Sequence, residues 1–333
     1  MRRLLVLVGL AAALLLATPA RAAEIAVQSW NTPWDPGAEN CAAHPHPPLE
    51  VHRFDSKTFV LRENLCATWE APFMYLLIGN ARALLIDTGD VADARMPLAA
   101  TVYDLLGAQH ALSLIVAHTH RHLDHRAGDS QFKGAGHGAP TIVGYDIDSV
   151  KRYYGFKDWP NGIAHVDLGG RVVDVIPAPG HNETQIVFYD RNTGLLFSGD
   201  FLMPARLLVD DPAAYVASAQ RVADFVRDKK VAGVLGGHVE MNRAGEVYDW
   251  ESTYHPDEHA LALGKADVLA LPATLTKFNG FYAQSGHVIM IDPTRNLLAV
   301  VIAASAVFVA AIAAVILGFR RWQRSHAGAR IAA

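Results

Sequence analysis

The sequence contains little cysteine and no excess of basic residues. Only Cys41 and Cys66 occur among 333 residues, so a metal cage built from cysteine thiolates is excluded. The formal net charge is −4, and the sequence therefore lacks the basic footprint of a nucleic-acid-binding protein. It also lacks a serine-triad elbow and a glycine-rich phosphate loop, which argues against a serine nucleophile and against a nucleotide cofactor.

The N-terminal end of the sequence has the pattern of an export signal. Arg2 and Arg3 precede an apolar stretch over residues 4–17, and Ala20-Arg21-Ala22 offers a small-x-small cleavage site. Residues 1–22 are therefore predicted to be a cleaved signal peptide, with an uncleaved anchor helix as the alternative. Export places the two cysteines in an oxidising compartment, where a Cys41–Cys66 disulfide is favoured over two free thiols.

A second apolar stretch lies near the C-terminal end. Residues 297–319 are long enough to cross about 30 Å of hydrocarbon, whereas a fully buried core helix is the alternative. Residues 320–333 carry Arg320, Arg321, Arg324 and Arg330, the cationic flank of a cytoplasmic side. The two ends together predict a single-pass membrane protein whose body lies on the periplasmic or extracytoplasmic face and whose C-terminus is cytoplasmic.

Between these ends, apolar runs alternate with helical patterns. Residues 23–57 are predicted to be an irregular N-terminal arm, residues 58–258 the main folded domain, and residues 259–296 a membrane-proximal segment. Expected strands cover residues 73–79, 83–87, 112–117, 141–144, 171–177, 184–189, 195–197 and 231–235, and expected helices cover 98–106, 148–154 and 212–228. Residues 261–271 could form a helix, and residues 278–282 and 289–291 could line the membrane surface. This order predicts mixed sheets with helices on the outside.

Histidine and aspartate residues follow directly after the apolar runs. They are His120, His122, Asp124, His125, His181, Asp200 and His238. Side chains at the ends of different strands converge at one edge of a sheet, and imidazole and carboxylate groups are ligands that zinc accepts. Asp124 and His125 are adjacent and are expected to face apart, so that one cluster can serve two metal ions. A merely polar loop would not explain ligand-type residues at three later strand ends.

These motifs resemble the metallo-β-lactamase superfamily. The resemblance covers roughly residues 59–238 and rests on the His-x-His-x-Asp-His run, Pro179-Gly-His181, Ser198-Gly-Asp200 and Gly237-His238. It implies a four-layer αββα sandwich with two zinc ions at one edge, iron or manganese being the other candidate metals. It assigns His120, His122 and His181 to the first metal, and Asp124, His125 and His238 to the second. Asp200 would bridge both metals, and Asp87 would orient the ligand loop from outside.

The resemblance also bears on the reaction. It implies hydrolysis of a small-molecule substrate by a water activated at the two metals, with Asp124 as the catalytic residue. True β-lactamases of this superfamily have Cys or Ser where this chain has Asp200, so the sequence resembles the glyoxalase-II-like and lactonase-like branches. The predicted bond is therefore an ester, a thioester or a lactone, with a β-lactam as the alternative. An alternative of another class is a mononuclear-iron oxygenase or a non-catalytic metal-binding module.

Some loop residues near the predicted centre could contact a substrate. These candidates are Trp69, Glu70, residues 201–206, Tyr254 and His255. His137, which lies among glycines, is expected to be a loop residue rather than an eighth ligand.

Overall fold

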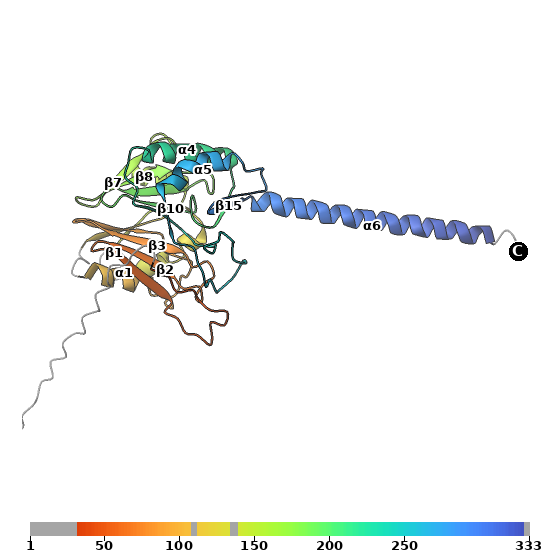
Figure 1. Ribbon diagram of the computed structural model, residues 1–333, viewed down its shortest axis with the longest axis horizontal. Coiled ribbons are helices and arrows are strands. Elements are labelled where there is room, and N and C mark those ends of the chain that lie inside the picture. The colour runs from red at the N-terminus through yellow and green to blue at the C-terminus, as the bar shows by residue number, and fades with distance from the viewer. Residues whose placement is uncertain (1–31, 108–111, 134–138, 330–333) are drawn as a thin grey trace, which may run out of the picture.

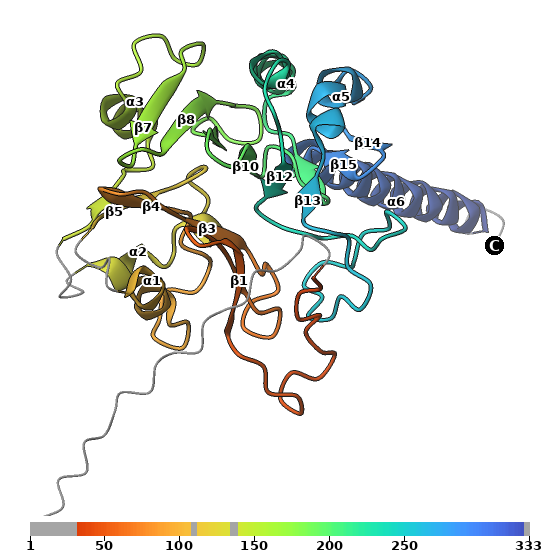
Figure 2. The same ribbon diagram turned by 60° about the vertical axis from the view of Figure 1, so that its left-hand side comes forward.

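The computed structural model describes residues 32–107, 112–133 and 139–329. The predicted signal peptide and His137 lie outside these residues. The described chain folds into two facing six-stranded sheets with helices on their outer faces (Figures 1 and 2), so that the layers follow the order αββα. This is the mixed α/β architecture that the sequence predicts.

The first sheet contains the N-terminal strands in chain order. They are β1 (Leu49–Asp55), β2 (Thr58–Glu63), β3 (Phe73–Ile78), β4 (Arg82–Ile86), β5 (Ser113–Ala117) and β6 (Thr141–Ile142). The ladders from β1 to β4 are antiparallel, and those from β4 to β6 are parallel. Figure 2 shows α1 (Leu98–Leu106) and α2 (Asp129–Phe132) against the outer face of this sheet.

The second sheet has the order β13-β12-β10-β9-β8-β7. Its strands are β7 (Ala164–Asp167), β8 (Val172–Pro177), β9 (Ile186–Asp190), β10 (Leu195–Gly199), β12 (Gly233–Gly236) and β13 (Ala262–Leu263). Its outer face carries α4 (Pro212–Val226) and α5 (Lys265–Leu275), as Figures 1 and 2 show. Helix α3 (Ile147–Tyr154) precedes β7 and turns Val150 into the space between the sheets.

Three apolar clusters hold the four layers together. Tyr75 and Phe197 meet between the sheets with their ring centroids 4.7 Å apart. Val102 of α1 packs on the outside of the first sheet, and Tyr215 of α4 packs on the outside of the second. Because most central strands are buried on both faces, they appear in the sequence as continuous apolar runs rather than as alternating patterns.

The segment predicted to be an irregular arm contains a strand. Regular structure begins at β1 rather than near Thr58, because residues 49–55 pair with β2 along the edge of the first sheet. Only His52 is fully buried within β1, so the strand has a weak apolar signal in the sequence. Before β1, a disulfide joins Cys41 to Cys66 and attaches the arm to the loop between β2 and β3.

The segment predicted to be membrane-proximal also contributes to the body of the fold. Strands β14 (Tyr282–Ser285) and β15 (Val288–Ile291) form a small sheet with β11 (Arg206–Leu208), in the order β11-β15-β14. Met290 is buried in the same cluster as α4 and α5, so residues 289–291 pack inside the protein instead of lining a membrane. Helix α5 starts later than expected because residues 262–263 pair with β12 as β13.

The chain then leaves the body of the fold in one long helix. Helix α6 (Pro293–Ala329) contains the predicted span of residues 297–319 and begins at a proline, which is favoured at a helix start. Over Pro293–Arg324 it is long and apolar enough to cross a membrane, and the apolar window inside that range is exposed. Figure 1 shows α6 extending away from the end of the molecule that carries β15.

Candidate metal centre

The ligand loop begins where β5 ends. Residues 118–122 continue directly from β5, and a short 3₁₀ turn, Leu123–His125, follows. This turn brings Asp124 Oδ2 to 3.1 Å from His125 Nε2, so these neighbours belong to one group of ligands. The expectation that they face apart is therefore wrong, because the 3₁₀ turn brings the two side chains onto the same side. Leu123, in the same turn, is 59% exposed.

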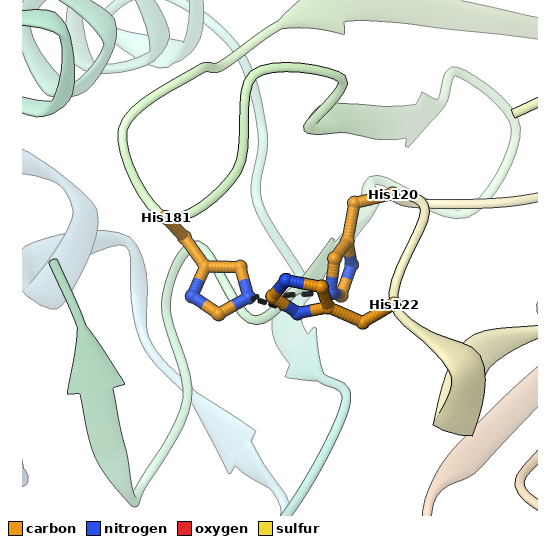
Figure 3. A group of neighbouring side chains, drawn as sticks. All are labelled: His120, His122 and His181. Atoms are coloured by element: carbon orange, nitrogen blue, oxygen red, sulfur yellow. Dashed lines mark hydrogen bonds between the residues drawn. The ribbon is translucent and has the colours of Figure 1, made fainter. Parts of the chain in front are cut away.

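A first group of ligand atoms consists of three imidazoles. His120 and His122 come from the loop after β5, and His181 comes from the turn that follows β8. His181 Nε2 lies 3.2 Å from His120 Nε2 and 3.1 Å from His122 Nδ1 (Figure 3). His120 and His181 are buried, whereas His122 is half-buried, so the group is open to solvent on the His122 side.

A second group combines two imidazoles with two carboxylates. His125 Nε2 and His238 Nε2 lie 3.3 Å apart, and Asp124 Oδ2 lies 3.2 Å from His238 Nε2. Asp200 Oδ1 lies 3.3 Å from His125 Nε2. Within each group, one ligand atom from every residue lies within 4.8 Å of the others.

Asp200 lies between the two groups. While its Oδ1 faces His125, its Oδ2 lies 3.6 Å from His181 Nε2 and 4.0 Å from His120 Nε2. Within the described part of the chain, Oδ1 is buried and accepts no hydrogen bond. A buried carboxylate oxygen without a partner is costly, and a cation at this position would satisfy it.

Hydrogen bonds from outside the cluster fix the orientation of the imidazoles. His181 Nδ1 donates to the Leu208 carbonyl oxygen at 3.0 Å, and His238 Nδ1 donates to the Glu70 carbonyl oxygen at 2.7 Å. His125 Nδ1 donates to Asp87 Oδ2 at 2.9 Å. Each of these bonds occupies Nδ1 and directs Nε2 into the cluster, where it is the atom positioned to bind a metal.

Asp87 connects the ligand loop to the end of β4. Its backbone is left-handed, with φ of 65°, and its side chain is buried. Its carboxylate accepts hydrogen bonds from the Thr119 backbone N–H at 2.7 Å and from the Thr119 hydroxyl at 2.9 Å. The same hydroxyl oxygen lies 3.1 Å from His120 Nδ1. Thr119 was not among the predicted site residues, although its position between His118 and His120 in the sequence is a signal that it belongs to the ligand loop.

Charge and burial set the protonation of the two groups in opposite directions. Burial holds the pKa of His120 well below its ordinary value, and burial together with the neighbouring His181 lowers the pKa of His122 to about 4. Burial alone would lower the pKa of His238 too, but the Asp200 and Asp124 carboxylates outweigh it and raise that pKa to about 10. At neutral pH His120 and His122 are therefore neutral imidazoles, the form that binds a metal.

The carboxylates of the second group are held in their charged form. Burial alone would raise the pKa of Asp124 and Asp200, but the nearby His125 and His238 hold both values well below the usual range. In the metal-free chain the same carboxylates keep the His125 and His238 imidazoles protonated, and a metal ion that binds there would displace these protons and find two ionised carboxylates and the unpartnered Asp200 oxygen. The donor chemistry of the two groups therefore fits divalent metal ions.

Among the loop residues predicted to contact a substrate, Trp69 and Glu70 lie in a loop that reaches the cluster. The Glu70 carbonyl contacts His238, and the preceding Trp69 packs edge-on against Trp250 with ring centroids 6.1 Å apart. Trp250 was missed in the sequence, where a single tryptophan in a polar loop carries no pattern. Its side chain is 53% exposed, and the Arg206 guanidinium lies 4.4 Å from its ring centroid.

Most of the other residues predicted to contact a substrate are buried in the body of the fold. Phe201 and Met203 are buried in the cluster under α4 and α5, so most of residues 201–206 packs the core. His255 is buried, lies 3.1 Å from Glu258 and stacks on a tyrosine, which gives it a structural role. Tyr254, beside it, remains partly exposed.

Two facing mixed sheets with a histidine and aspartate cluster define an αββα fold with a candidate metal site. The chain belongs to the Metallo-beta-lactamase superfamily, whose sequence profile matches residues 67–270. The resemblance predicted from the His-x-His-x-Asp-His run is thereby confirmed.

Similar proteins were found both by sequence and by structure. An acyl-coenzyme A thioesterase MBLAC2 of Gallus gallus is 26% identical over 232 residues, which cover 60% of this chain and 83% of that protein. The Homo sapiens protein of the same name is 30% identical over 93 residues, which cover 27% of this chain and 33% of that protein. A solved metallo-beta-lactamase from Pontibacter korlensis has a TM-score of 0.46 at 18% identity, covering 68% of this chain and 99% of that one.

Proposed function

We propose that the protein is a hydrolase that uses two zinc ions to cleave a thioester bond. The observation that carries the proposal is the position of Asp200, whose two oxygens face the two groups of ligand atoms. A single carboxylate shared in this way is suited to hold two cations close together. Among the ester, thioester and lactone bonds predicted from the sequence, the relatives named acyl-coenzyme A thioesterases favour the thioester.

Each ligand residue has a defined task in this proposal. The first ion would be held by His120, His122 and His181 and the second by Asp124, His125 and His238, with Asp200 available to both. When bound, the two ions supply Lewis acidity to the substrate carbonyl oxygen and to the attacking water. Asp87 and Thr119 keep the ligand loop in place.

Asp124 is the residue that we assign to proton transfer. Its side chain is 20% exposed, compared with 9% for Asp200, so it is the carboxylate of the cluster that a water beside the substrate can reach. Because its pKa lies well below the usual range, Asp124 is ionised at neutral pH and can accept a hydrogen bond that orients the water.

We further propose that α6 anchors this centre to a membrane. Its exposed apolar window and the following Arg320, Arg321 and Arg324 favour a single span over residues 297–319 with a cytoplasmic C-terminus. The charge and cleavage pattern of residues 1–22 supports export and removal of that segment, which leaves the body on the extracytoplasmic face.

A substrate screen tests the proposed reaction. The full chain in detergent, loaded with zinc, is assayed against thioester, ester, lactone, phosphodiester and β-lactam substrates. We expect thioester hydrolysis, its loss in Asp124→Ala, and its retention in Asp148→Ala, a change of an exposed aspartate on α3. Preferred turnover of the β-lactam would support a β-lactam hydrolase instead. One iron per chain together with oxygen consumption would support an oxygenase.

A further inference from the structure

The first group of ligands is directly connected to the root of α6. His181 donates its Nδ1 proton to the carbonyl oxygen of Leu208, the last residue of β11. Leu208 is the register partner of Ile291 in the parallel β11–β15 ladder. Ile291 ends β15, and α6 begins at Pro293. One imidazole and one strand spacing of about 4.8 Å therefore separate the metal centre from the strand that leads into α6.

The loop beside the second group of ligands is connected to β11 and β15 by aromatic side chains. Trp69 directly precedes Glu70, whose carbonyl holds His238, and Trp69 packs against Trp250. Trp250 in turn lies under the Arg206 guanidinium. Arg206 begins β11 and is the register partner of Ile289 in β15. The two tryptophans thus form an aromatic wall, Trp69–Trp250, that joins the loop beside His238 to β11, the strand that pairs with β15.

The surface around the root of α6 exposes further aromatic side chains. Phe281 is 45% exposed and Tyr282 is 49% exposed. Phe281 lies alongside the first turn of α6, because its carbonyl oxygen accepts a hydrogen bond from Asn296 Nδ2 at 3.1 Å and another from the Asp292 backbone N–H at 3.3 Å. Exposed phenylalanine and tyrosine side chains beside an apolar helix are typical of a membrane–water interface.

The direction of α6 determines what these aromatic side chains face. The apolar part of the helix starts at Leu297, about one turn after Pro293. A bilayer that holds this part therefore begins about one helical turn after Pro293, six residues beyond the end of β15. Figures 1 and 2 show β7 at the opposite end of the body from α6, so the two ends of the body differ in their distance from such a bilayer.

We propose that the metal centre opens toward the bilayer that holds α6 and hydrolyses a membrane-dissolved amphiphile, a long-chain acyl thioester whose chain lies along the Trp69–Trp250 wall. The proposal rests on the thioesterase function proposed above and adds the class of substrate. One water is consumed: its hydroxyl joins the acyl carbon to give a fatty acid, the C–S bond breaks, and the sulfur leaves as a thiol with the remaining proton. The apolar chain enters from the bilayer, where such substrates are concentrated.

A depth measurement tests the orientation without using activity. Phe281→Cys and Ile163→Cys each receive a nitroxide label in the full chain, reconstituted in phosphatidylcholine vesicles; Cys41 and Cys66 are joined to each other and do not react. Ile163 is the matched control, because it is 49% exposed and directly precedes β7 at the far end. We expect oxygen to relax the label at Phe281 and an aqueous nickel chelate to relax the label at Ile163. Equal access of the nickel chelate to both labels would overturn the orientation.

A kinetic measurement tests the substrate class. Butyryl and palmitoyl thioesters of N-acetylcysteamine are compared with the zinc-loaded chain in the same vesicles. We expect kcat/KM to be higher for the palmitoyl substrate, and Trp250→Ser to lower the palmitoyl-to-butyryl ratio about tenfold, the loss of one aromatic contact. Phe281→Ser should slow palmitoyl turnover and leave butyryl turnover unchanged, and Ile163→Ser should change neither.

The outcomes separate the two proposals. Butyryl hydrolysis with a ratio near one, or a ratio unaffected by Trp250→Ser, would overturn the membrane-substrate proposal and leave the thioesterase intact. Hydrolysis of neither thioester would overturn the thioesterase function together with the proposed substrate. The nitroxide measurement would then still decide on its own whether the surface around the root of α6 lies at the bilayer.

Discussion

Gly237 lies directly against the carboxylate of Asp200. A Cβ atom built on Gly237 would lie 2.3 Å from Asp200 Oδ1 and 2.7 Å from His125 Cε1. Gly237 directly follows β12, so glycine allows the backbone after this strand to approach the cluster while the next residue, His238, contributes a ligand atom.

Gly237→Ala should therefore impair metal binding without removing a ligand. The added methyl group must displace the carboxylate that faces both ligand groups, and we expect zinc affinity to fall by about 10–100-fold, as for other changes around metal ligands. Competition with a chelator measures the affinity. Gly233→Ala in β12 is the control, because its Cβ would make an ordinary contact 3.5 Å from Leu195 Cδ2. Equal zinc affinity in the two variants would contradict this role of Gly237.

Asp87→Asn should weaken the second metal position more than the first. The amide keeps the volume of the carboxylate but removes its charge, and it cannot accept hydrogen bonds on both atoms from His125 and Thr119. We expect the zinc content after dialysis to fall from about two ions per chain towards one. Elemental analysis measures the zinc content of Asp87→Asn, a buried change, and of the control Asp148→Asn, an exposed one. Full zinc content in Asp87→Asn would show that Asp87 does not orient His125.

Glu63 should make the stability of the metal-free chain depend on pH. Burial raises the pKa of this carboxyl group from 4.5 to about 7, although the backbone N–H groups of Asp90 and Val91 oppose the shift. The folded state therefore holds the proton more tightly, so this stabilisation is complete below pH 4.5 and is lost as the pH rises through 7. The loss amounts to roughly 3 kcal/mol.

Glu63→Gln removes this titration and provides the comparison. Its melting temperature relative to the wild type should rise between pH 5 and pH 8, as circular dichroism of the full chain in detergent can measure. A constant difference in melting temperature across this range would show that Glu63 does not titrate with a raised pKa.

Cys41→Ser should destabilise the body of the fold. The disulfide closes a loop with a sequence separation of 25, and loop-closure entropy gives it a contribution of about 3 kcal/mol. The N-terminal arm also pairs with residue 254 through the Gly37–Tyr254 bridge. Loss of the disulfide therefore loosens the contacts of the arm with the loop after β2 and with the segment around Tyr254. We expect a lower melting temperature for Cys41→Ser and an equal fall for the wild type under reducing conditions. Reductant that lowers the melting temperature of Cys41→Ser as well would indicate a different cause.

The ligand set and the central strands were accessible from the sequence for physical reasons. Strands buried on both faces leave continuous apolar runs, and ligand residues must follow such strands to converge at one edge. The run from β5 into His120 shows both features together. The structure brings all seven predicted ligand residues into the two groups described above.

The strands at the edges of the sheets and the carbonyl groups that orient the ligands could not be predicted from the sequence. β1 and the hairpin of β14 and β15 derive their structure from pairing with distant strands, so their own sequences carry weak signals. The Leu208 and Glu70 carbonyl groups that orient His181 and His238 are backbone atoms, which no residue type identifies. Trp250 acquires its position only through contacts with Trp69 and Arg206.

Zinc titration of the metal-free full chain tests the central claim most directly. Hydrolysis of the butyryl thioester is followed while zinc is added in known equivalents. We expect activity to rise and to reach its plateau at about two zinc ions per chain, because Asp200 faces both groups of ligand atoms. Absence of thioester hydrolysis at every zinc level, or a plateau at one equivalent, would contradict it.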